Sequence, residues 1–152
     1  MIRILFVCHG NICRSPMAEY ITKYLAREKG IDSQLYITSK ATSLEEIGND
    51  IYPPVKKVLS KNKIPYDTHK ATRITKPDLD NFDLIIGMDS YNMQNIERIL
   101  GPSSKIHKLC EYSNTDIDVD DPWYTRDFDA CYGEIYAHCK NLLKFLSITL
   151  VK

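Results

Sequence analysis

The stretch IRILFVCHGNICRSP, residues 2–16, decides the fold that we expect for this chain. It opens with the apolar run Ile2–Val7, which is rich in β-branched side chains and predicts a strand buried on both faces. A helix should follow almost at once, because Ser15 suits its N-cap, Pro16 its first position and Glu19 its first turn. One short loop therefore joins the carboxyl end of the strand to the start of the helix.

The alternation of strand and helix continues along the chain. Gly30 closes the first helix, and either Asp89 or Ser90 caps a later one. Apolar runs and helical spacing predict further strands and helices, in chain order, at 35–38, 55–61, 84–88, 90–100, 105–109 and 135–146. Such units form a parallel sheet covered by helices on both faces, with ligands at the carboxyl ends of the strands. We expect one domain over residues 1–152.

Composition and charge exclude several classes of protein. Among 152 residues, twenty Lys and Arg balance twenty Asp and Glu, which argues against a broad basic surface for nucleic acid or anionic lipid. No stretch approaches the roughly eighteen apolar residues of a membrane span. The five cysteines lack C-x-x-C spacing, so neither a disulfide framework nor a zinc site is predicted. We therefore expect a reduced cytoplasmic protein without nucleic-acid or membrane partners.

The loop after the first strand has the composition of an oxyanion site. Its backbone N–H groups and the following helix dipole converge on one point. Gly10 and Asn11 readily take the positive φ that a loop curled round an anion needs. Arg14 can close the ring with paired hydrogen bonds to two oxygens of a phosphate-like anion. A structural turn would not need this arginine.

Cys8 is placed at the base of that ring. Inward-facing amides, the helix N-terminus and Arg14 would all favour its thiolate, and Ser15 can hydrogen-bond the sulfur. A thiolate facing a bound phosphate forms a phosphocysteine, which is nucleophilic catalysis. The alternative is a buried residue at a strand end beside a tight turn.

Asp121 is the best candidate for the acid and base that such a reaction needs. It precedes Pro122, which favours an extended or turn conformation, and Trp123 and Tyr124 can wall the site and grip an aryl ring. Two alternatives are a solvated acidic loop and a calcium loop. The calcium loop fits poorly, because its sixth position would be Asp121 instead of glycine and its twelfth Asp127 instead of glutamate.

These motifs strongly resemble the low-molecular-weight protein tyrosine phosphatase family. The resemblance is carried by CHGNICRSP at 8–16 and DPWY at 121–124, with further landmarks at 39–43, 46–49, 74–76 and 87–89. It covers essentially the whole chain. It implies a flavodoxin-like, three-layer αβα fold with a four-stranded parallel sheet, and hydrolysis of phosphotyrosine and small aryl phosphates without a metal or other cofactor.

The resemblance also implies roles for individual residues. Cys8 matches the nucleophile, Arg14 the phosphate clamp and Asp121 the general acid and then base. The rest of the phosphate-binding loop comprises His9, Gly10, Asn11, Ile12, Cys13 and Ser15. The supporting polar network and the substrate cleft are matched by Ser39, His69, Glu46, Trp123 and Tyr124. Cys13 matches a cysteine that can form a reversible disulfide with Cys8 under oxidants.

Substrates and departures from the family pattern complete the expectation. Tyrosine-phosphorylated proteins are the implied substrates, phosphate or other oxyanions the product or inhibitor, and we expect a monomer. Three residues differ from those usual at their positions in the family: Lys40, Asp50 and Thr72. The family pattern therefore does not predict the charge of the substrate cleft or the hinge of the loop.

Two other activities share this fold and loop. In related phosphatases that act on phosphoarginine, a threonine stands at the position that matches Ile12. A branched aliphatic residue such as Ile12 suits a tyrosyl ring. A thiol-dependent arsenate reductase would need two further cysteines a few residues apart near the site, but Cys110 is alone in its segment. A phosphate-binding module without catalysis would not need Cys8, and a phosphocysteine carrier would not need Asp121.

Overall fold

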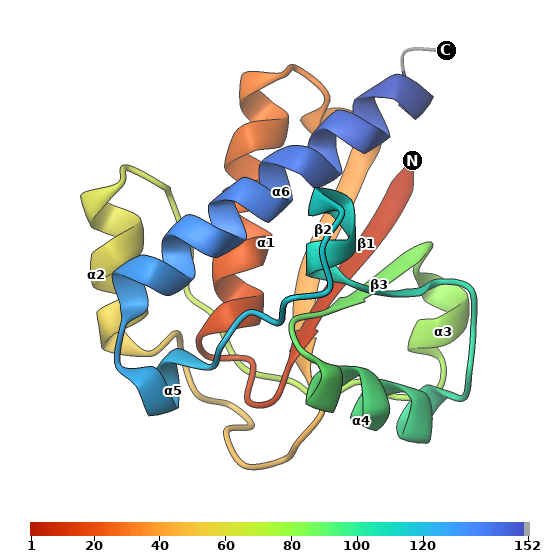
Figure 1. Cartoon of the computed structure of the whole chain (residues 1–152), viewed down its shortest axis with the longest axis horizontal. Helices are drawn as coiled ribbons and strands as arrows, with labels where there is room; N and C mark the ends of the chain where they lie inside the picture. Colours follow the sequence, from red (N-terminus) through yellow and green to blue (C-terminus); the bar gives the residue numbers. More distant parts are fainter. Residues whose placement is uncertain (151–152) are drawn as a thin grey trace.

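The computed structural model describes residues 1–150 and contains one sheet of four parallel strands in the order β2-β1-β3-β4 (Figure 1). The strands are β1 (Ile2–Cys8), β2 (Leu35–Ala41), β3 (Leu84–Gly87) and β4 (Ile106–Lys108). In β1, Cys8 is paired with Ala41 of β2, and Val7 is paired with Gly87 of β3. The carboxyl ends of the central strands therefore meet at one edge of the sheet, as the flavodoxin-like order requires.

Helices cover both faces of this sheet. They are α1 (Arg14–Glu28), α2 (Pro53–Lys61), α3 (Asp78–Asn81), α4 (Ser90–Leu100), α5 (Pro122–Thr125) and α6 (Phe128–Leu150), with 3₁₀ turns at Asp32–Gln34 and Leu109–Ser113. In Figure 1, α1 and α6 lie on one side of β1, and α3 and α4 lie on the other. The predicted three-layer αβα class is confirmed. No helix among residues 1–150 is long and apolar enough to cross a membrane.

The central strand β1 supplies both hydrophobic cores, because successive side chains of a strand point to opposite faces. Ile4 and Phe6 belong to the core formed with α1 and α6, while Leu5 and Val7 belong to the core formed with α4. All four side chains are fully buried. The predicted burial of this run on both faces is confirmed, and the loop that follows it starts from a rigid base.

The start of α1 differs from the sequence prediction. Its first residue is Arg14 and its N-cap position is Cys13, without a side-chain cap, so the prediction of Ser15 as N-cap is wrong. The Ser15 hydroxyl contacts the Cys8 sulfur instead. Glu19 also lies beyond the first turn, which contains no acidic residue. Gly30 does follow the end of the helix, with a φ of 72°.

Other elements agree with the prediction apart from their ends. β2 extends to Ala41, and β4 is only three residues long. Asp89, and not Ser90, caps α4 by accepting a hydrogen bond from the backbone N–H of Asn92 at 2.6 Å. The helices α3 and α5 were not predicted, because a single turn of four residues shows no apolar periodicity.

Asp78 ties α3 to β2 and gives the first prediction. Its buried carboxylate accepts hydrogen bonds at 2.8 Å from the Lys40 ammonium and from the backbone N–H of Thr75. In Asp78→Ala both donors lose their acceptor, so the free energy of unfolding should fall by about 2 kcal/mol. Urea titration should show a lower midpoint with an unchanged slope. Asp80→Ala, an exposed position in the same helix, is the control, and equal midpoints for the two variants would contradict the prediction.

Candidate active site

The Cys8 sulfur lies inside a ring of hydrogen-bond donors at the carboxyl end of β1. The backbone N–H groups of Asn11 and Ser15 donate to it at 3.3 and 3.4 Å, and the Ser15 hydroxyl lies 3.0 Å away. Cys8 is only 3% exposed, so water adds little to this solvation. The ring of donors around the sulfur at the N-terminus of α1 is the arrangement that the sequence predicted.

The loop keeps its shape through Asn11. This residue has a φ of 59°, in the left-handed region, whereas Gly10 has no positive φ, so the expectation for Gly10 is wrong. Glycine at position 10 instead allows Glu46 to pack closely, because a Cβ there would lie 3.2 Å from the Glu46 side chain. Asn11 is fully buried, and its amide donates to the hydroxyls of Ser15 and Ser39 at 2.8 and 2.9 Å. Those bonds offset the cost of its backbone conformation.

A further segment, residues 69–72, holds the Asn11 backbone and side chain. The His69 ring lies 2.7 Å from the Asn11 carbonyl, and because a carbonyl only accepts, Nε2 must carry the proton. The backbone N–H of Thr72 donates to the Asn11 side-chain oxygen at 3.3 Å. The structure thus brings together the expected network of Asn11, Ser15, Ser39 and His69.

Glu19 extends this network, a contact that sequence reasoning missed. Its buried carboxylate accepts a hydrogen bond from Ser39 at 2.6 Å and pairs with Lys23 at 2.6 Å. The chain of hydrogen bonds therefore runs from Glu19 through Ser39 to Asn11 and Ser15. The sequence held one signal for this burial, because Glu19 lies among the apolar residues of a predicted helix. An acidic side chain that is buried there needs a hydrogen-bond or charge partner.

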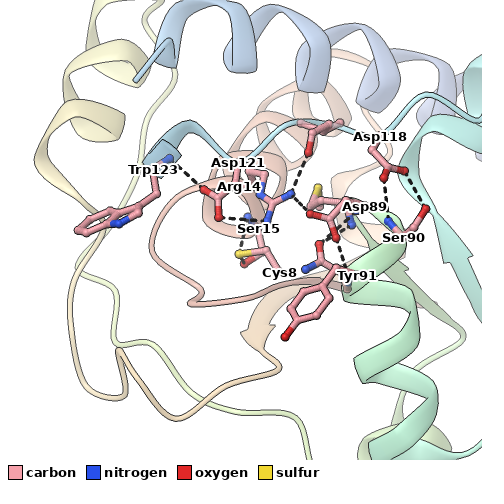
Figure 2. A network of polar contacts seen from close by, with 12 residues as sticks. Cys8, Arg14, Ser15, Asp89, Ser90, Tyr91, Asp118, Asp121 and Trp123 are labelled. Atoms are coloured by element: carbon pink, nitrogen blue, oxygen red, sulfur yellow. Dashed lines mark hydrogen bonds and ion pairs between the residues drawn. The ribbon is translucent and has the colours of Figure 1, made fainter. Parts of the chain in front are cut away.

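Arg14 is 2% exposed and lies between two carboxylates and a carbonyl (Figure 2). Its Nη1 donates to Asp89 at 2.6 Å and to the Val119 carbonyl at 2.8 Å, and its Nη2 lies 3.5 Å from Asp121. Burial by itself would lower the pKa of the guanidinium, but the nearby Cys8 and Asp89 raise it. Asp89 was expected chiefly as a helix cap; it both caps α4 and holds Arg14.

Asp121 stands at the mouth of the same site. Its Oδ1 accepts the backbone N–H of Trp123 at 2.9 Å and so caps α5, and its extended backbone agrees with the expectation from Pro122. The side chain is 23% exposed, which leaves it open to the cavity. A carboxyl group in this position can exchange a proton with a group bound over the Cys8 sulfur.

One cavity of about 130 Å³ joins these groups. It is lined by Cys8, His9, Gly10, Ile12, Cys13, Arg14, Glu45, Glu46, Asp121, Trp123 and Tyr124. The expected aromatic wall is exposed, with Trp123 at 45% and Tyr124 at 81%. Glu45 was missed by the sequence analysis; it hydrogen-bonds His9 at 2.8 Å at the rim.

The three departures from the family pattern lie outside this cavity. Lys40 is turned toward Asp78, as described above. Asp50 accepts hydrogen bonds from the backbone N–H groups of His69 and Ile51, and the hydrogen bond from Lys56 lowers its pKa. Thr72 contributes only its backbone N–H to the network. None of the three therefore contributes a charge to the cavity wall, and Asp50 supports the His69 segment.

The remaining cysteines are buried and free. Burial, with Cys8 and Asp121 nearby, raises the pKa of the Cys13 thiol. Burial also raises the pKa of Cys110, and it raises the pKa values of Cys131 and Cys139 to about 12. Within residues 1–150, no group of three or more His, Cys, Asp or Glu side chains is arranged to hold a metal ion.

The site combines a cysteine beneath a ring of amides, a buried arginine and an aspartate at the rim, all at one edge of a flavodoxin-like sheet. This combination is typical of phosphatases built on a cysteine-containing phosphate-binding loop. The family model for low molecular weight phosphotyrosine protein phosphatase matches residues 3–151. The chain belongs to this family, and the resemblance noted in the sequence is confirmed.

Individual relatives agree with that assignment. The low molecular weight protein-tyrosine-phosphatase PtpA of Staphylococcus epidermidis is 40% identical in an alignment of 149 residues that covers 96% of this chain and 94% of that protein. The crystal structure of YfkJ from Bacillus subtilis superposes with a TM-score of 0.94 at 37% identity, covering 98% of this chain and 96% of that one. A structure of the YwlE arginine phosphatase is also similar, with a TM-score of 0.86 at 26% identity over 96% of each chain.

The five cysteines should differ sharply in reactivity. We expect iodoacetamide near neutral pH to alkylate Cys8 first, because its sulfur lines the cavity and accepts N–H hydrogen bonds, whereas burial keeps the other thiols protonated. Peptide mass mapping after brief exposure measures this order, and inorganic phosphate should slow labelling of Cys8. Labelling in guanidinium is the control, where all five should react alike. Labelling of Cys13 or Cys131 ahead of Cys8 would contradict the prediction.

Proposed function

We propose that this chain hydrolyses phosphotyrosine and small aryl phosphates through a phosphocysteine on Cys8. The observation that carries the proposal is the convergence of the Cys8 sulfur, the Arg14 guanidinium and the Asp121 carboxyl group on one cavity. Membership of the phosphatase family supports the same reaction. The loop amides and Arg14 supply the positive field that a phosphate dianion needs, and Asp121 supplies the proton-transfer group.

The reaction proceeds in two displacements. The Cys8 thiolate attacks phosphorus and forms the S–P bond, while the bond from phosphorus to the tyrosyl oxygen breaks and protonated Asp121 gives that oxygen its proton. Water then attacks the phosphocysteine, Asp121 takes a proton from the water, and the S–P bond breaks to release phosphate. The Ser15 hydroxyl, 3.0 Å from the sulfur, stabilises the departing thiolate.

Arg14 and the loop amides stabilise the negative charge of the phosphoryl group. The developing negative charge on the phosphoryl oxygens falls among amides that are already oriented, so little reorganisation is needed in the transition state. Because Arg14 is held by Asp89 and Val119, it can present its planar group at a fixed position. The remaining loop residues, His9, Gly10, Ile12 and Cys13, border the phosphate position.

The cavity favours a tyrosyl ester over phosphoarginine. Ile12, Trp123 and Tyr124 offer an apolar pocket with aromatic walls, which suits a flat aryl ring. The protein-tyrosine-phosphatase PtpA of Staphylococcus epidermidis is also more similar in sequence than the arginine phosphatase, at 40% against 26% identity. Cleavage of phosphoarginine at a rate equal to that of phosphotyrosine would refute this preference.

A cellular setting is part of the same proposal. We place the protein in the cytoplasm as a monomeric, single-domain enzyme acting on tyrosine-phosphorylated proteins, without nucleic-acid or membrane partners. All five cysteines are free thiols, which fits a reducing compartment. Cys13 would then guard Cys8 by forming a disulfide with it under oxidants.

Replacing the nucleophile tests the proposal most directly. Cys8→Ser should lower kcat toward p-nitrophenyl phosphate and a phosphotyrosine peptide by at least about a thousandfold, because serine is not ionised at neutral pH. Released phosphate measures the rate. Cys110→Ser, a matched change at a cysteine outside the cavity, should keep activity in the folded protein. Full activity of the Cys8→Ser protein would refute the mechanism.

The role of Asp121 predicts a dependence on the leaving group. Asp121→Ala should lower kcat/KM by about a hundredfold or more for phenyl phosphate, whose leaving oxygen must be protonated. The loss should be much smaller for dinitrophenyl phosphate, whose phenolate leaves without a proton. Steady-state kinetics on a series of aryl phosphates measures this, and an equal loss across the series would remove Asp121 from the role of acid.

A further inference from the structure

The segment that carries Asp121 has little regular structure of its own. Between the 3₁₀ turn at Leu109–Ser113 and α5, residues 115–121 form neither helix nor strand. Asp121 itself makes one side-chain hydrogen bond, to the Trp123 amide within its own turn, and a looser ion pair with Arg14 at 3.5 Å. A general acid needs a fixed position relative to the oxygen that it protonates, so contacts elsewhere in the segment must supply that position.

Val119 provides the first of these contacts. Its side chain is fully buried, and its N–H donates to the Met88 carbonyl at 3.0 Å. Its own carbonyl accepts from Arg14 at 2.8 Å. The backbone two residues before Asp121 is therefore joined to the end of β3 and to the phosphate-binding arginine.

Asp118 provides the second set of contacts, with Ser90 of α4 and Lys108 of β4. Its Oδ2 accepts the backbone N–H of Ser90 at 3.1 Å, and its Oδ1 accepts the Ser90 hydroxyl at 3.2 Å and the Lys108 ammonium at 2.8 Å. Figure 2 shows Asp118 facing Ser90 beside the Arg14 site. We refer to Ser90, Lys108 and Asp118 as the Asp118 cluster.

The cluster uses the same helix end that positions Arg14. Ser90 is the first residue of α4 and Asp89 is its N-cap. Two carboxylates therefore meet the N-terminus of α4, where backbone N–H groups and the helix dipole favour negative charge. Asp89 reaches from that end to Arg14, and Asp118 joins the Asp121 segment to it. One rigid element thus sets the relative positions of the phosphate clamp and the acid.

Lys108, at the end of β4, offsets the negative charge that Asp118 adds at the N-terminus of α4. Besides Asp118, its ammonium contacts the Ser90 hydroxyl at 3.2 Å and the Asp116 carbonyl at 3.3 Å, so it binds the segment at two points. Burial opposes the charged form of Asp118, but the hydrogen bonds from Lys108 and Ser90 outweigh it and lower its pKa. The hydrogen bond to Asp118 raises the pKa of Lys108. Both members stay charged at neutral pH.

We propose that Asp118, held by Ser90 and Lys108, is a positioning residue that fixes Asp121 relative to Arg14 for proton transfer to the leaving group. The inference rests on the proposed function, because it assigns a reason for the efficiency of that acid. Asp118 lines no part of the cavity and touches no reacting atom. Because Asp89 continues to hold Arg14 when Asp118 is lost, phosphate binding and the attack of Cys8 should be largely spared. Protonation of the tyrosyl oxygen by Asp121 should be impaired.

The readout is the dependence of kcat/KM on the pKa of the leaving phenol. For this mechanism kcat/KM reports the steps up to formation of the phosphocysteine, in which the acid acts. Asp118→Asn keeps the shape of the side chain and removes the charge that pairs with Lys108. We expect kcat/KM to fall by about tenfold for phenyl phosphate and by less than about twofold for dinitrophenyl phosphate, so the slope becomes steeper toward that of Asp121→Ala.

A matched control lies in the same segment. Asp116 is an exposed acid two residues away that contacts Lys108 only through its backbone carbonyl. Asp116→Asn makes the same change of charge and should leave the slope of the wild-type enzyme unchanged. If Asp118→Asn does not fold, Lys108→Met removes the counter-charge from outside the segment and should steepen the slope in the same direction.

The outcomes separate the two hypotheses. A wild-type protein inactive toward every aryl phosphate would overturn the proposed function and, with it, the assignment of a positioned acid. An active enzyme whose slope is the same in wild type and Asp118→Asn would overturn the positioning role alone, as would a uniform loss across the series. Amide hydrogen exchange adds a structural measure: the Val119 N–H, bonded to Met88, should exchange faster in Asp118→Asn, and unchanged protection would count against the inference.

Discussion

The buried charge of Arg14 is the constraint on which the rest of the site depends. A guanidinium that is 2% exposed has almost no water to solvate it, so protein groups must match its charge and its donors. The groups that do so come from two parts of the chain distant from Arg14: Asp89 follows β3, and the segment before α5 supplies both the Val119 carbonyl and Asp121. Satisfying one charge therefore gathers the acid, the helix end and the phosphate-binding loop at one edge of the sheet.

The left-handed conformation of Asn11 imposes a second constraint from the opposite side. Its φ of 59° is retained because its amide donates hydrogen bonds to Ser15 and Ser39, and because its oxygens accept hydrogen bonds from His69 and Thr72. With Asn11 fixed, its own N–H and that of Ser15 point at the Cys8 sulfur. The loop is thus organised before any phosphate arrives, which is the condition for stabilising charge in the transition state without reorganisation.

Sequence reasoning succeeded where the physical signal is local. The strands and the longer helices repeat apolar residues at the spacing that burial requires, and a cysteine-to-arginine loop between a buried strand and a helix has a composition that a plain turn lacks. It failed for Ser15 because two local roles compete. A serine before proline suits a helix cap, but the Cys8 sulfur and the Asn11 amide offered contacts that only the folded loop creates. One-turn helices such as α3 escaped for lack of periodicity.

Long-range polar contacts account for most of the remainder. Glu19 with Ser39, Asp89 with Arg14 and Asp118 with Lys108 leave no periodic pattern, since a hydrogen bond between distant segments depends on how the elements meet. Asp89 was the most accessible of these, because it directly follows a parallel strand at the edge where ligands bind. Its capping role was visible in the sequence, whereas its contact with Arg14 required the fold.

The acidic segment shows why a net charge of zero said little about the site. Asp116, Asp118, Asp120 and Asp121 lie close in sequence to a site that must attract a dianion, which at first sight opposes binding. In the fold two of them are already matched, Asp118 by Lys108 and the α4 N-terminus, and Asp121 by the Trp123 amide and Arg14. Asp116 and Asp120 remain exposed, where water and salt screen them. Electrostatic selection of phosphate therefore falls to the buried Arg14 and the loop amides, where the dielectric is low and each hydrogen bond counts most.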